Sequence, residues 1–306
     1  MEFSTTERTT RTVFDGIQAG HEALPASLQR FRTLITTAGL GVPDDFFHGK
    51  TCADIGCGAT VNSTFNLLNL NAEFVHALDL TESFIEPARR VLTAEPGFSG
   101  RWQLDVGSVA RLPYADNKFD FVVCHGVIHN VENDDLALSE IYRCLKPGGM
   151  ANLTVLGKGG LIGRLVMELL RDEYRTNPEF TALLDHGLNP DYLAQQIDWL
   201  KMQVENDGSE SYRLSLQLLD ALKGLLDHDW ILTLQDRVQT PVYHTYRETE
   251  FESKLGRAGF SAWRRISRKP VYQNIRKILA PLYFHYQMPL ARLLFQDGAL
   301  VMVATK

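Results

Sequence analysis

The sequence lacks the features that would place the protein in a membrane or outside the cell. No stretch of about 18 consecutive apolar residues occurs, and residues 1–14 lack the apolar core of a signal peptide. The chain has only 4 cysteines in 306 residues, and no two of them have C-x-x-C spacing. We therefore expect a cytoplasmic protein whose thiols are reduced and buried, with neither disulfides nor a zinc site.

Basic charge is also scarce. The chain has 31 Lys and Arg against 37 Asp and Glu, a net charge of −6, which argues against a broad nucleic-acid-binding surface. Residues 157–242 contain 14 acidic and 8 basic side chains, so this segment alone accounts for the imbalance. Such a shift in composition indicates a separate structural unit.

What the sequence does contain is an alternation of short apolar runs with helical segments. This pattern is typical of β-α units on a parallel sheet, so it predicts a doubly wound α/β fold. The predicted strands are residues 51–56, 74–80, 101–107, 119–125, 150–157, 261–267 and 298–305. The sequence Pro147-Gly148-Gly149 predicts the end of one helix and the turn into the fifth strand.

The alternation stops twice, and the two interruptions define the expected organisation. Helical periodicity without strands predicts a helical insertion at 158–240 and a smaller one at 270–296. The expected units are an N-terminal helical segment (1–48), a ligand-binding core (49–157), the first insertion (158–240) and the rest of the core (241–306). The length of the chain favours one large domain with insertions over two independent domains.

The stretch CADIGCGAT, residues 52–60, ends the first predicted strand with two closely spaced glycines. Gly56 and Gly58 leave a bare turn that a ligand can approach, although a tight turn without a ligand is an equal alternative. The third glycine of a dinucleotide fingerprint would fall on Val61, so a pyrophosphate is poorly supported. Asp79 ends the second strand, where it can accept both ribose hydroxyls or, alternatively, cap a helix. Together these features predict an adenosine-type ligand without a diphosphate.

Four stretches in order carry a family resemblance: ADIGCGAT (53–60), ALDLTESFIEPAR (77–89), ARLPYADNKFDFVVCHGVIHNV (110–131) and ALSEIYRCLKPGGMANLTV (137–155). Over residues 46–157 the chain resembles the class I S-adenosylmethionine-dependent methyltransferases of the small-molecule branch. The resemblance implies a Rossmann-like, mostly parallel seven-stranded sheet and S-adenosylmethionine as cofactor, with S-adenosylhomocysteine as product. The cofactor-binding residues it implies are Asp54, Gly56, Cys57, Gly58, Asp79, Leu80, Ser108, Val109 and the main chain at His125.

The implied reaction moves a methyl group to an O, N or C atom of a small organic acceptor. Such an in-line displacement needs alignment, and it needs a base only where the acceptor carries a proton. We prefer His129 as that base, because it matches the first histidine of the family's segment after the fourth strand, although such histidines are often structural. The other candidates are His125 and His244 as bases, and Asn130, Tyr243 and His244, together with His129, as contacts of the substrate.

Several alternatives remain at this stage. The chain could be an NAD(P)-dependent oxidoreductase, or a non-catalytic module that binds S-adenosylmethionine and acts through its helical surface. Residues 158–240 are interpreted as a lid over the substrate, and the alternative is an element for packing or dimerisation. The basic stretch 264–277 and the aromatic residues that interleave or follow it could bind an anionic or prenylated substrate or contact a membrane, and packing on its own domain is favoured over membrane contact. The stretch DHDW, 227–230, is interpreted as an exposed acidic turn and not as a metal site. Neither the acceptor nor the oligomeric state follows from the sequence.

Overall fold

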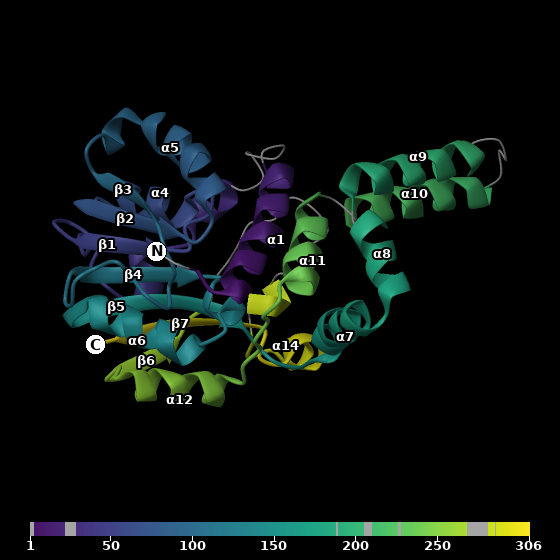
Figure 1. The fold of residues 1–306 in the computed structure, drawn as a ribbon. Helices are drawn as coiled ribbons and strands as arrows, with labels where there is room; N and C mark the ends of the chain where they lie inside the picture. The colour runs from purple at the N-terminus through teal and green to yellow at the C-terminus, as the bar shows by residue number, and fades with distance from the viewer. Residues whose placement is uncertain are drawn as a thin grey trace.

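The architecture is known from a computed structural model that describes residues 3–21, 29–187, 189–204, 210–225, 228–267, 281–284 and 286–306. At its centre lies a seven-stranded sheet in the order β3-β2-β1-β4-β5-β7-β6 (Figure 1). The strands are β1 (Thr51–Ile55), β2 (Phe74–Asp79), β3 (Trp102–Val106), β4 (Phe119–His125), β5 (Leu145–Leu156), β6 (Ala262–Arg265) and β7 (Ala299–Thr305). Strands β1 to β5 pair in parallel, and β7 is antiparallel to both of its neighbours. The predicted α/β fold with a mostly parallel sheet is confirmed.

The two faces of the sheet carry two separate apolar clusters, because successive side chains of a strand point to opposite faces. Phe121 and Val123 of β4 belong to the cluster on one face, and Val122 and Cys124 belong to the cluster on the other. Strands buried on both faces read as continuous apolar runs, which is why the sequence located them. All four cysteines are buried and free, as expected.

Helices cover both faces of the sheet (Figure 1). One face carries α4 (Asn62–Asn69) and α5 (Ile85–Thr93), and the other carries α6 (Asp134–Cys144) and α12 (Glu248–Ala258). Polar contacts fix α12 against α6: Asp134 accepts hydrogen bonds from the Tyr246 hydroxyl at 2.8 Å and from Lys254 Nζ at 2.8 Å. The short helices between these elements are η1 (Gln29–Thr33), α3 (Thr37–Leu40), η2 (Glu82–Phe84), η3 (Pro96–Phe98) and η4 (Ile128–Asn130).

The start of β5 differs from the prediction. Helix α6 ends at Cys144, and β5 begins at Leu145, so the Pro147-Gly148-Gly149 sequence lies inside the strand instead of in a turn before it. The pairing with β4 shifts register between Phe119 and Phe121, and Gly148 has a φ of 74° there. A glycine in this conformation allows a bulge that lets the chain keep pairing.

Helices from distant parts of the chain cover the carboxyl ends of the parallel strands. Helix α1 (Thr5–His21) lies beside α11 (His228–Gln239), and both stand next to the ends of the parallel strands (Figure 1). The expected insertion at 158–240 is helical and contains η5 (Gly163–Glu168), α7 (Leu169–Thr176), α8 (Pro178–Gly187), α9 (Pro190–Val204), α10 (Glu210–Leu225) and α11. Helices α9 and α10 pack on each other and project away from the sheet (Figure 1).

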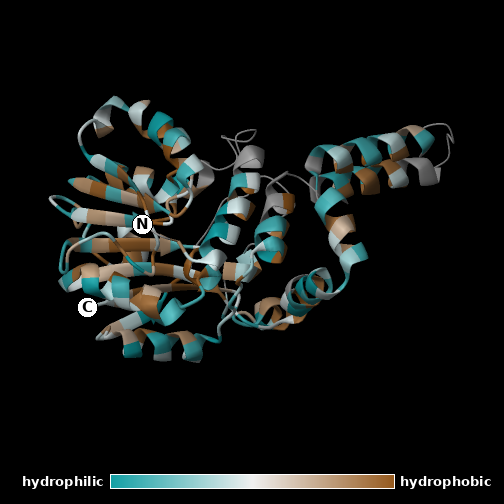
Figure 2. Ribbon diagram, in the orientation of Figure 1, coloured by the Kyte–Doolittle hydropathy of each residue, from teal (hydrophilic) through white to brown (hydrophobic). Residues whose placement is uncertain are grey.

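Apolar side chains are concentrated in the sheet, and the outer helices are mixed (Figure 2). The projecting pair leaves several of its apolar side chains exposed, among them Trp199 of α9 and Leu214 and Leu218 of α10. Of the helices that the structure describes, none combines the length and the apolar character needed to cross a bilayer. The predicted insertion at 270–296 falls partly outside the described residues, and its described part includes α14 (Pro289–Phe295).

A buried arginine holds the two ends of the first insertion together. Arg171 of α7 is only 6% exposed, and its guanidinium donates to the carbonyl oxygens of Arg237 at 2.7 Å, Val238 at 3.2 Å and Thr240 at 2.6 Å. The last carbonyls of a helix have no partner within the helix, so Arg171 supplies the missing donors for α11.

Replacing this arginine should destabilise the fold. We expect Arg171→Leu to lower the free energy of unfolding by about 1–3 kcal/mol, because it leaves buried carbonyl oxygens without donors. Denaturant unfolding measures the change. Arg175→Leu is the matched control, since Arg175 is exposed and donates to Pro241 only. If the two variants lose equal amounts of unfolding free energy, the capping role of Arg171 is contradicted.

Candidate active site

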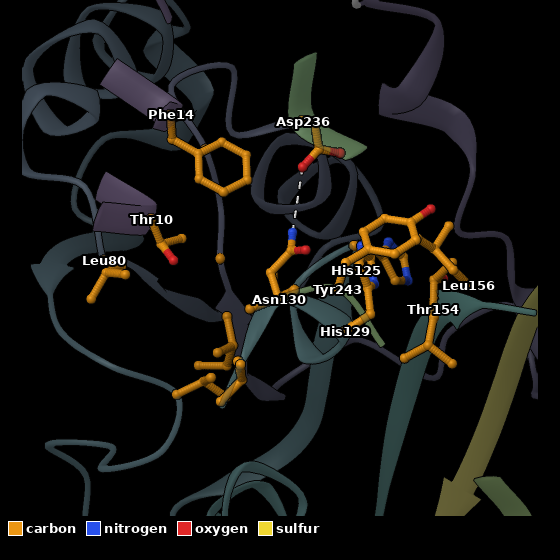
Figure 3. Close-up of a pocket in the computed structure, with 18 of the residues that line it drawn as sticks. Thr10, Phe14, Leu80, His125, His129, Asn130, Thr154, Leu156, Asp236 and Tyr243 are labelled. Carbon is orange, nitrogen blue, oxygen red and sulfur yellow. Dashed lines mark hydrogen bonds between the residues drawn. The ribbon is translucent and has the colours of Figure 1, made fainter. Parts of the chain in front are cut away.

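A cavity of about 970 Å³ opens at the carboxyl ends of the parallel strands. The strand order reverses between β1 and β4, and crevices at such a reversal are where doubly wound sheets bind ligands. The loops that follow β1, β2, β3, β4 and β5 line the cavity, and α1 and α11 add residues from the opposite side (Figure 3). Its volume is at the upper end of the range for small-molecule sites, roughly 300–1,000 Å³.

The loop after β1 has the bare backbone that the glycines predict. Gly56 has a φ of 78°, and a Cβ atom there would collide with Cγ2 of Val127 in the loop after β4. Gly58 has a φ of 62°, and a Cβ built on it would meet no atom within 4 Å. Gly56 therefore allows the two loops to pack together, and Gly58 leaves main chain open to the cavity. Val61, in place of a third glycine, starts α4 with a φ of 43°.

Asp54 connects β1 to α4. Its Oδ2 atom accepts from the main-chain nitrogen of Thr64 at 2.9 Å and from Thr64 Oγ1 at 2.7 Å. Burial raises the pKa of this carboxyl to about 7, although both hydrogen bonds act to lower the pKa. The side chain lines the cavity but is only 2% exposed, so its main contribution is to fix the loop that carries Gly56, Cys57 and Gly58.

Asp79 ends β2 and faces the same loop. Its Oδ2 atom accepts from the main-chain nitrogen of Gly58 at 2.8 Å, and Oδ1 accepts from the main-chain nitrogen of Thr81 at 2.9 Å. Burial raises the pKa of the carboxyl. The side chain of Thr81 and the main chain of Leu80 also act on this carboxylate, which is 7% exposed and lines the cavity.

The other predicted cofactor contacts also reach the cavity. Leu80, Ser108 and Val109 line it, and Ser108 Oγ accepts from the main-chain nitrogen of Ala110 at 3.1 Å. Asp105 does not line the cavity, because its carboxylate accepts from the Tyr114 hydroxyl at 2.9 Å. The roles of the lining residues stay predictions.

Neighbouring side chains hold the imidazole of His125. Its Nε2 atom lies 2.7 Å from Asn152 Oδ1, and its Nδ1 atom lies 3.4 Å from Ser63 Oγ. An amide oxygen can only accept, so Nε2 carries the proton and donates it to Asn152. Asn152 in turn donates through Nδ2 to the carbonyl oxygen of Met302 at 3.3 Å. This fixed ring lines the cavity, but it is less suited to proton transfer than a ring without partners.

His129 lies in the short helix η4, is 3% exposed, and lines the cavity with a buried Nδ1 atom that has no hydrogen-bond partner. Its ring meets that of Tyr243 edge to face, with centroids 6.0 Å apart. Burial lowers the pKa of His129 to about 3, and the charges of Arg237 and His244 add to this effect. The ring is therefore neutral near pH 7.

The structure does not bring His244 to the cavity. Its Nε2 atom lies 3.1 Å from the carbonyl oxygen of Val131 and so donates to it, while its main-chain nitrogen donates to the carbonyl oxygen of His129 at 2.7 Å. Tyr243 and Thr245 line the cavity, and His244 does not. Side chains alternate in extended chain, so the residue between two cavity-facing positions points the other way. The prediction that His244 acts as a base or contacts the substrate is not supported.

Asp236 and Arg237 of α11 line the cavity, and sequence reasoning missed both. Asn130 donates through Nδ2 to Asp236 Oδ1 at 3.4 Å, and Figure 3 shows the two side chains pointing toward each other. Burial raises the pKa of Asp236 to about 6, although Arg237 and the bond from Asn130 act to lower the pKa. No local motif marks Asp236 in the sequence, because its partner lies 106 residues away.

The cover of the cavity differs from the predicted lid. Only the two ends of the 158–240 insertion line the cavity, through residues such as Ile162, Glu168 and Asp236, and α8, α9 and α10 contribute none of the described lining residues. Helix α1 adds to the cover with Thr10 and Phe14 (Figure 3). The sequence did not predict this role for the N-terminal segment.

Comparison with known proteins agrees with this geometry. Residues 53–153 match the family described as a methyltransferase domain. A demethylmenaquinone methyltransferase of Symbiobacterium thermophilum is 30% identical over 47% of this chain and 57% of its own length. A ubiquinone/menaquinone biosynthesis C-methyltransferase of Hydrogenovibrio crunogenus is 34% identical over 39% of this chain and 46% of its own length. A bifunctional biotin biosynthesis protein of Teredinibacter turnerae is 29% identical over 59% of this chain and 32% of its own length. The chain thus spans less than two thirds of the length of each.

The fold also has a solved counterpart. The partner of the Haloferax volcanii Trm112 methyltransferase activator, in the structure of their complex, superimposes with a TM-score of 0.53 at 14% identity, covering 97% of this chain and 96% of that one. An identity this low shows the fold alone. Residues 53–153 thus match a methyltransferase domain, and the sheet that contains them has the mostly parallel order expected of the class I S-adenosylmethionine-dependent methyltransferases.

The residues at the cavity fit S-adenosylmethionine. Gly58 leaves open space beside its main chain, Asp79 places a carboxylate in the cavity for ribose hydroxyls, and Leu80 and Val109 supply apolar walls for a base. Four buried polar atoms without partners also line the cavity, and a ligand can satisfy them: Asn62 Oδ1, His129 Nδ1, Asn130 Oδ1 and Thr154 Oγ1.

The ribose assignment of Asp79 has a direct test. We expect Asp79→Asn to weaken the binding of S-adenosylhomocysteine by about 1.5–3 kcal/mol, the contribution of hydrogen bonds to a charged group. Titration calorimetry measures the affinity. Asp105→Asn, at the end of the adjacent strand β3, should leave it unchanged. An Asp79→Asn variant with wild-type affinity would remove Asp79 from the cofactor site.

The neutral state of His129 makes a prediction about pH. Its pKa is about 3 in the folded protein, against roughly 6.5 in an unfolded chain, so the unfolded state takes up a proton first as the pH falls. The stability that the neutral ring contributes is complete above about pH 6.5 and is lost toward pH 3. Between pH 7 and pH 5 we expect the wild type to lose about 2 kcal/mol more unfolding free energy than His129→Gln. If the unfolding free energies of the two proteins change in parallel with pH, the lowered pKa of His129 is contradicted.

Proposed function

We propose that this protein is an enzyme that transfers the methyl group of S-adenosylmethionine to an atom of a small organic acceptor. The observation that carries the proposal is that one cavity holds both the predicted cofactor residues and a separate polar patch. The loop with Gly58 and the carboxylate of Asp79 are at one part of this cavity, and His129, Asn130 and Asp236 are at another. A cavity of about 970 Å³ has room for a donor and an acceptor together.

The acceptor part of the cavity is enclosed mostly by segments outside the matched family region. Phe14 comes from α1, Ile162 from the helical residues directly before η5, Tyr243 from the segment after α11, and Phe295 from α14. Apolar and aromatic walls with few polar groups are typical of sites for small organic molecules. Two of the relatives are named for methylation in quinone biosynthesis, but the match ends before most of these walls, so we do not assign this chain their acceptor.

The residues of this chain align the two reactants. S-adenosylmethionine, when bound, supplies a methyl group on a positively charged sulfur. Asp79 orients its nucleoside, and the bare loop at Gly58 admits the rest of it. The cover formed by α1 and α11 excludes water from the acceptor side, and in-line alignment then lowers the barrier without a dedicated nucleophile.

The same observations weigh against the alternatives. Val61 begins α4 where a dinucleotide fingerprint would have its third glycine, and the family match is to methyltransferases, so an NAD(P)-dependent oxidoreductase is not favoured. A non-catalytic module would not require buried polar atoms without partners on the acceptor side of the cavity.

Calorimetry with three ligands tests the proposal. We expect S-adenosylmethionine and S-adenosylhomocysteine to bind and NADH not to bind. Incubation with methyl-labelled S-adenosylmethionine and a mixture of small molecules should then move label into an organic product. Binding of NADH without binding of either sulfur nucleoside would refute the methyltransferase.

A further inference from the structure

The acceptor patch consists of His129, Asn130, Thr154 and Asp236, which all line the cavity, and Asp236 approaches Asn130 from α11 on the opposite side (Figure 3). His129 and Asn130 are 3% and 7% exposed, and His129 Nδ1 and Asn130 Oδ1 are buried atoms without hydrogen-bond partners. Thr154 Oγ1 is also buried without a partner. Buried polar atoms are normally satisfied, so three unsatisfied atoms on residues that line the same cavity indicate a place for polar atoms of a ligand.

The free capacity of this patch is mainly for accepting hydrogen bonds. Asn130 uses its amide nitrogen on Asp236, which leaves its oxygen, an atom that can only accept. The carboxylate of Asp236 receives one long hydrogen bond, of 3.4 Å, so most of its lone pairs remain available. A neutral histidine offers one accepting and one donating ring nitrogen, and the threonine hydroxyl can do both.

Charge around the cavity favours the same kind of ligand. The described residues that line it include six carboxylates, Asp54, Asp79, Asp236, Glu7, Glu132 and Glu168, and a single cationic side chain, Arg237. An anionic acceptor would be repelled by this lining and would find few donors to replace its water.

We propose that the acceptor patch binds an uncharged O–H or N–H group of the methyl acceptor, and that the carboxylate of Asp236 takes the proton of that group during transfer. The proposal rests on the proposed function and goes further by naming the acceptor atom as a proton-bearing heteroatom. It assigns the role of base to a residue of α11, in place of the histidine that the sequence favours.

The step balances in atoms and charge. A lone pair of the heteroatom forms the bond to the methyl carbon, the bond from sulfur to that carbon breaks with its electron pair left on sulfur, and the heteroatom's proton passes to Asp236. The positive sulfur and the negative carboxylate both become neutral. Asp236 returns the proton to water when the products leave.

The surroundings of Asp236 and His129 give these two candidate bases different pKa values. An efficient base has a pKa near the working pH. Burial leaves the pKa of Asp236 at about 6, and it lowers the pKa of His129 to about 3, which makes the histidine a weak proton acceptor. Arg237, the next residue of α11, and Arg171 of α7 both help to keep Asp236 ionised. His129 thus orients the acceptor, and Asp236 holds the proton.

A matched set of naphthalenes tests the recognition without knowledge of the natural acceptor. With the protein saturated by S-adenosylhomocysteine, calorimetry compares 2-naphthol, 2-methoxynaphthalene and 2-naphthoate, which have the same rings. The first carries a hydroxyl group that can donate a hydrogen bond. The second carries the same oxygen with a methyl group in place of the proton, and the third carries a carboxylate. We expect wild type to bind 2-naphthol about tenfold more tightly than 2-methoxynaphthalene, the effect of one hydrogen bond to a carboxylate. The naphthoate should bind weakest.

Variants connect this preference to Asp236. Asp236→Asn should bind the two neutral naphthalenes within about twofold of each other, and Asp236→Glu should restore part of the preference for 2-naphthol. The matched control is Asp172→Asn, because Asp172 is an exposed acid of the same insertion that does not line the cavity. It should keep the wild-type preference.

The outcomes separate this proposal from the function on which it rests. Failure of S-adenosylhomocysteine to bind would refute the methyltransferase itself. If S-adenosylhomocysteine binds, the acceptor proposal is overturned by any of three results: wild type binds both neutral naphthalenes equally or neither of them, the naphthoate binds best, or Asp236→Asn keeps the wild-type preference. Restored preference in Asp236→Glu shows that the carboxylate matters and that loss in the asparagine variant is not a folding defect.

Discussion

The close approach of Gly56 to Val127 sets the geometry of the whole site. Because Gly56 has no Cβ, the loop after β1 can pack directly against the loop after β4. That contact brings the main chain at Gly58, predicted to face the cofactor, close to the short helix that carries His129 and Asn130. A Cβ at position 56 would collide with Val127 Cγ2, so a larger side chain there requires the two loops to move apart. The site therefore depends on one residue that does no chemistry.

Much of the fold and of the cofactor side could be predicted from the sequence, because their signals are local. Buried parallel strands are continuous apolar runs, and the residues that follow them must gather at one edge of the sheet. Asp79 was placed at this edge in this way, and Leu80 and Ser108 by the family resemblance; all three line the cavity, and their roles stay predictions. The start of β5 was missed because a strand with a glycine bulge has the same letters as a turn. His244 was misplaced because the phase of an irregular extended segment is set by its hydrogen bonds, here to Val131 and His129.

The acceptor side could not be predicted, because its residues meet only through tertiary packing. Among the residues of α11 whose burial is described, the buried apolar ones are Ile231, Leu234 and Val238, and Asp236 lies off that stripe. Such a position predicts an exposed side chain on an isolated helix. The packing of α1 beside α11 and the cavity between them turn it into a half-buried carboxylate. The spacing of apolar residues identifies the apolar and polar faces of a helix, but it does not show which parts of the protein each face contacts.

The position of Asp236 depends in turn on a contact far from the core. Arg171 donates to three carbonyl oxygens at the end of α11 and lies 5.0 Å above the ring of Tyr243, so one buried side chain ties the last helix of the insertion to the wall of the cavity. The middle of the insertion, α8 to α10, lies outside that connection. Changes in the projecting pair α9 and α10 can therefore accumulate without moving Asp236, whereas a change at Arg171 alters the acceptor site directly. The insertion thus combines two anchored ends that shape the cavity with a middle that the cavity does not constrain.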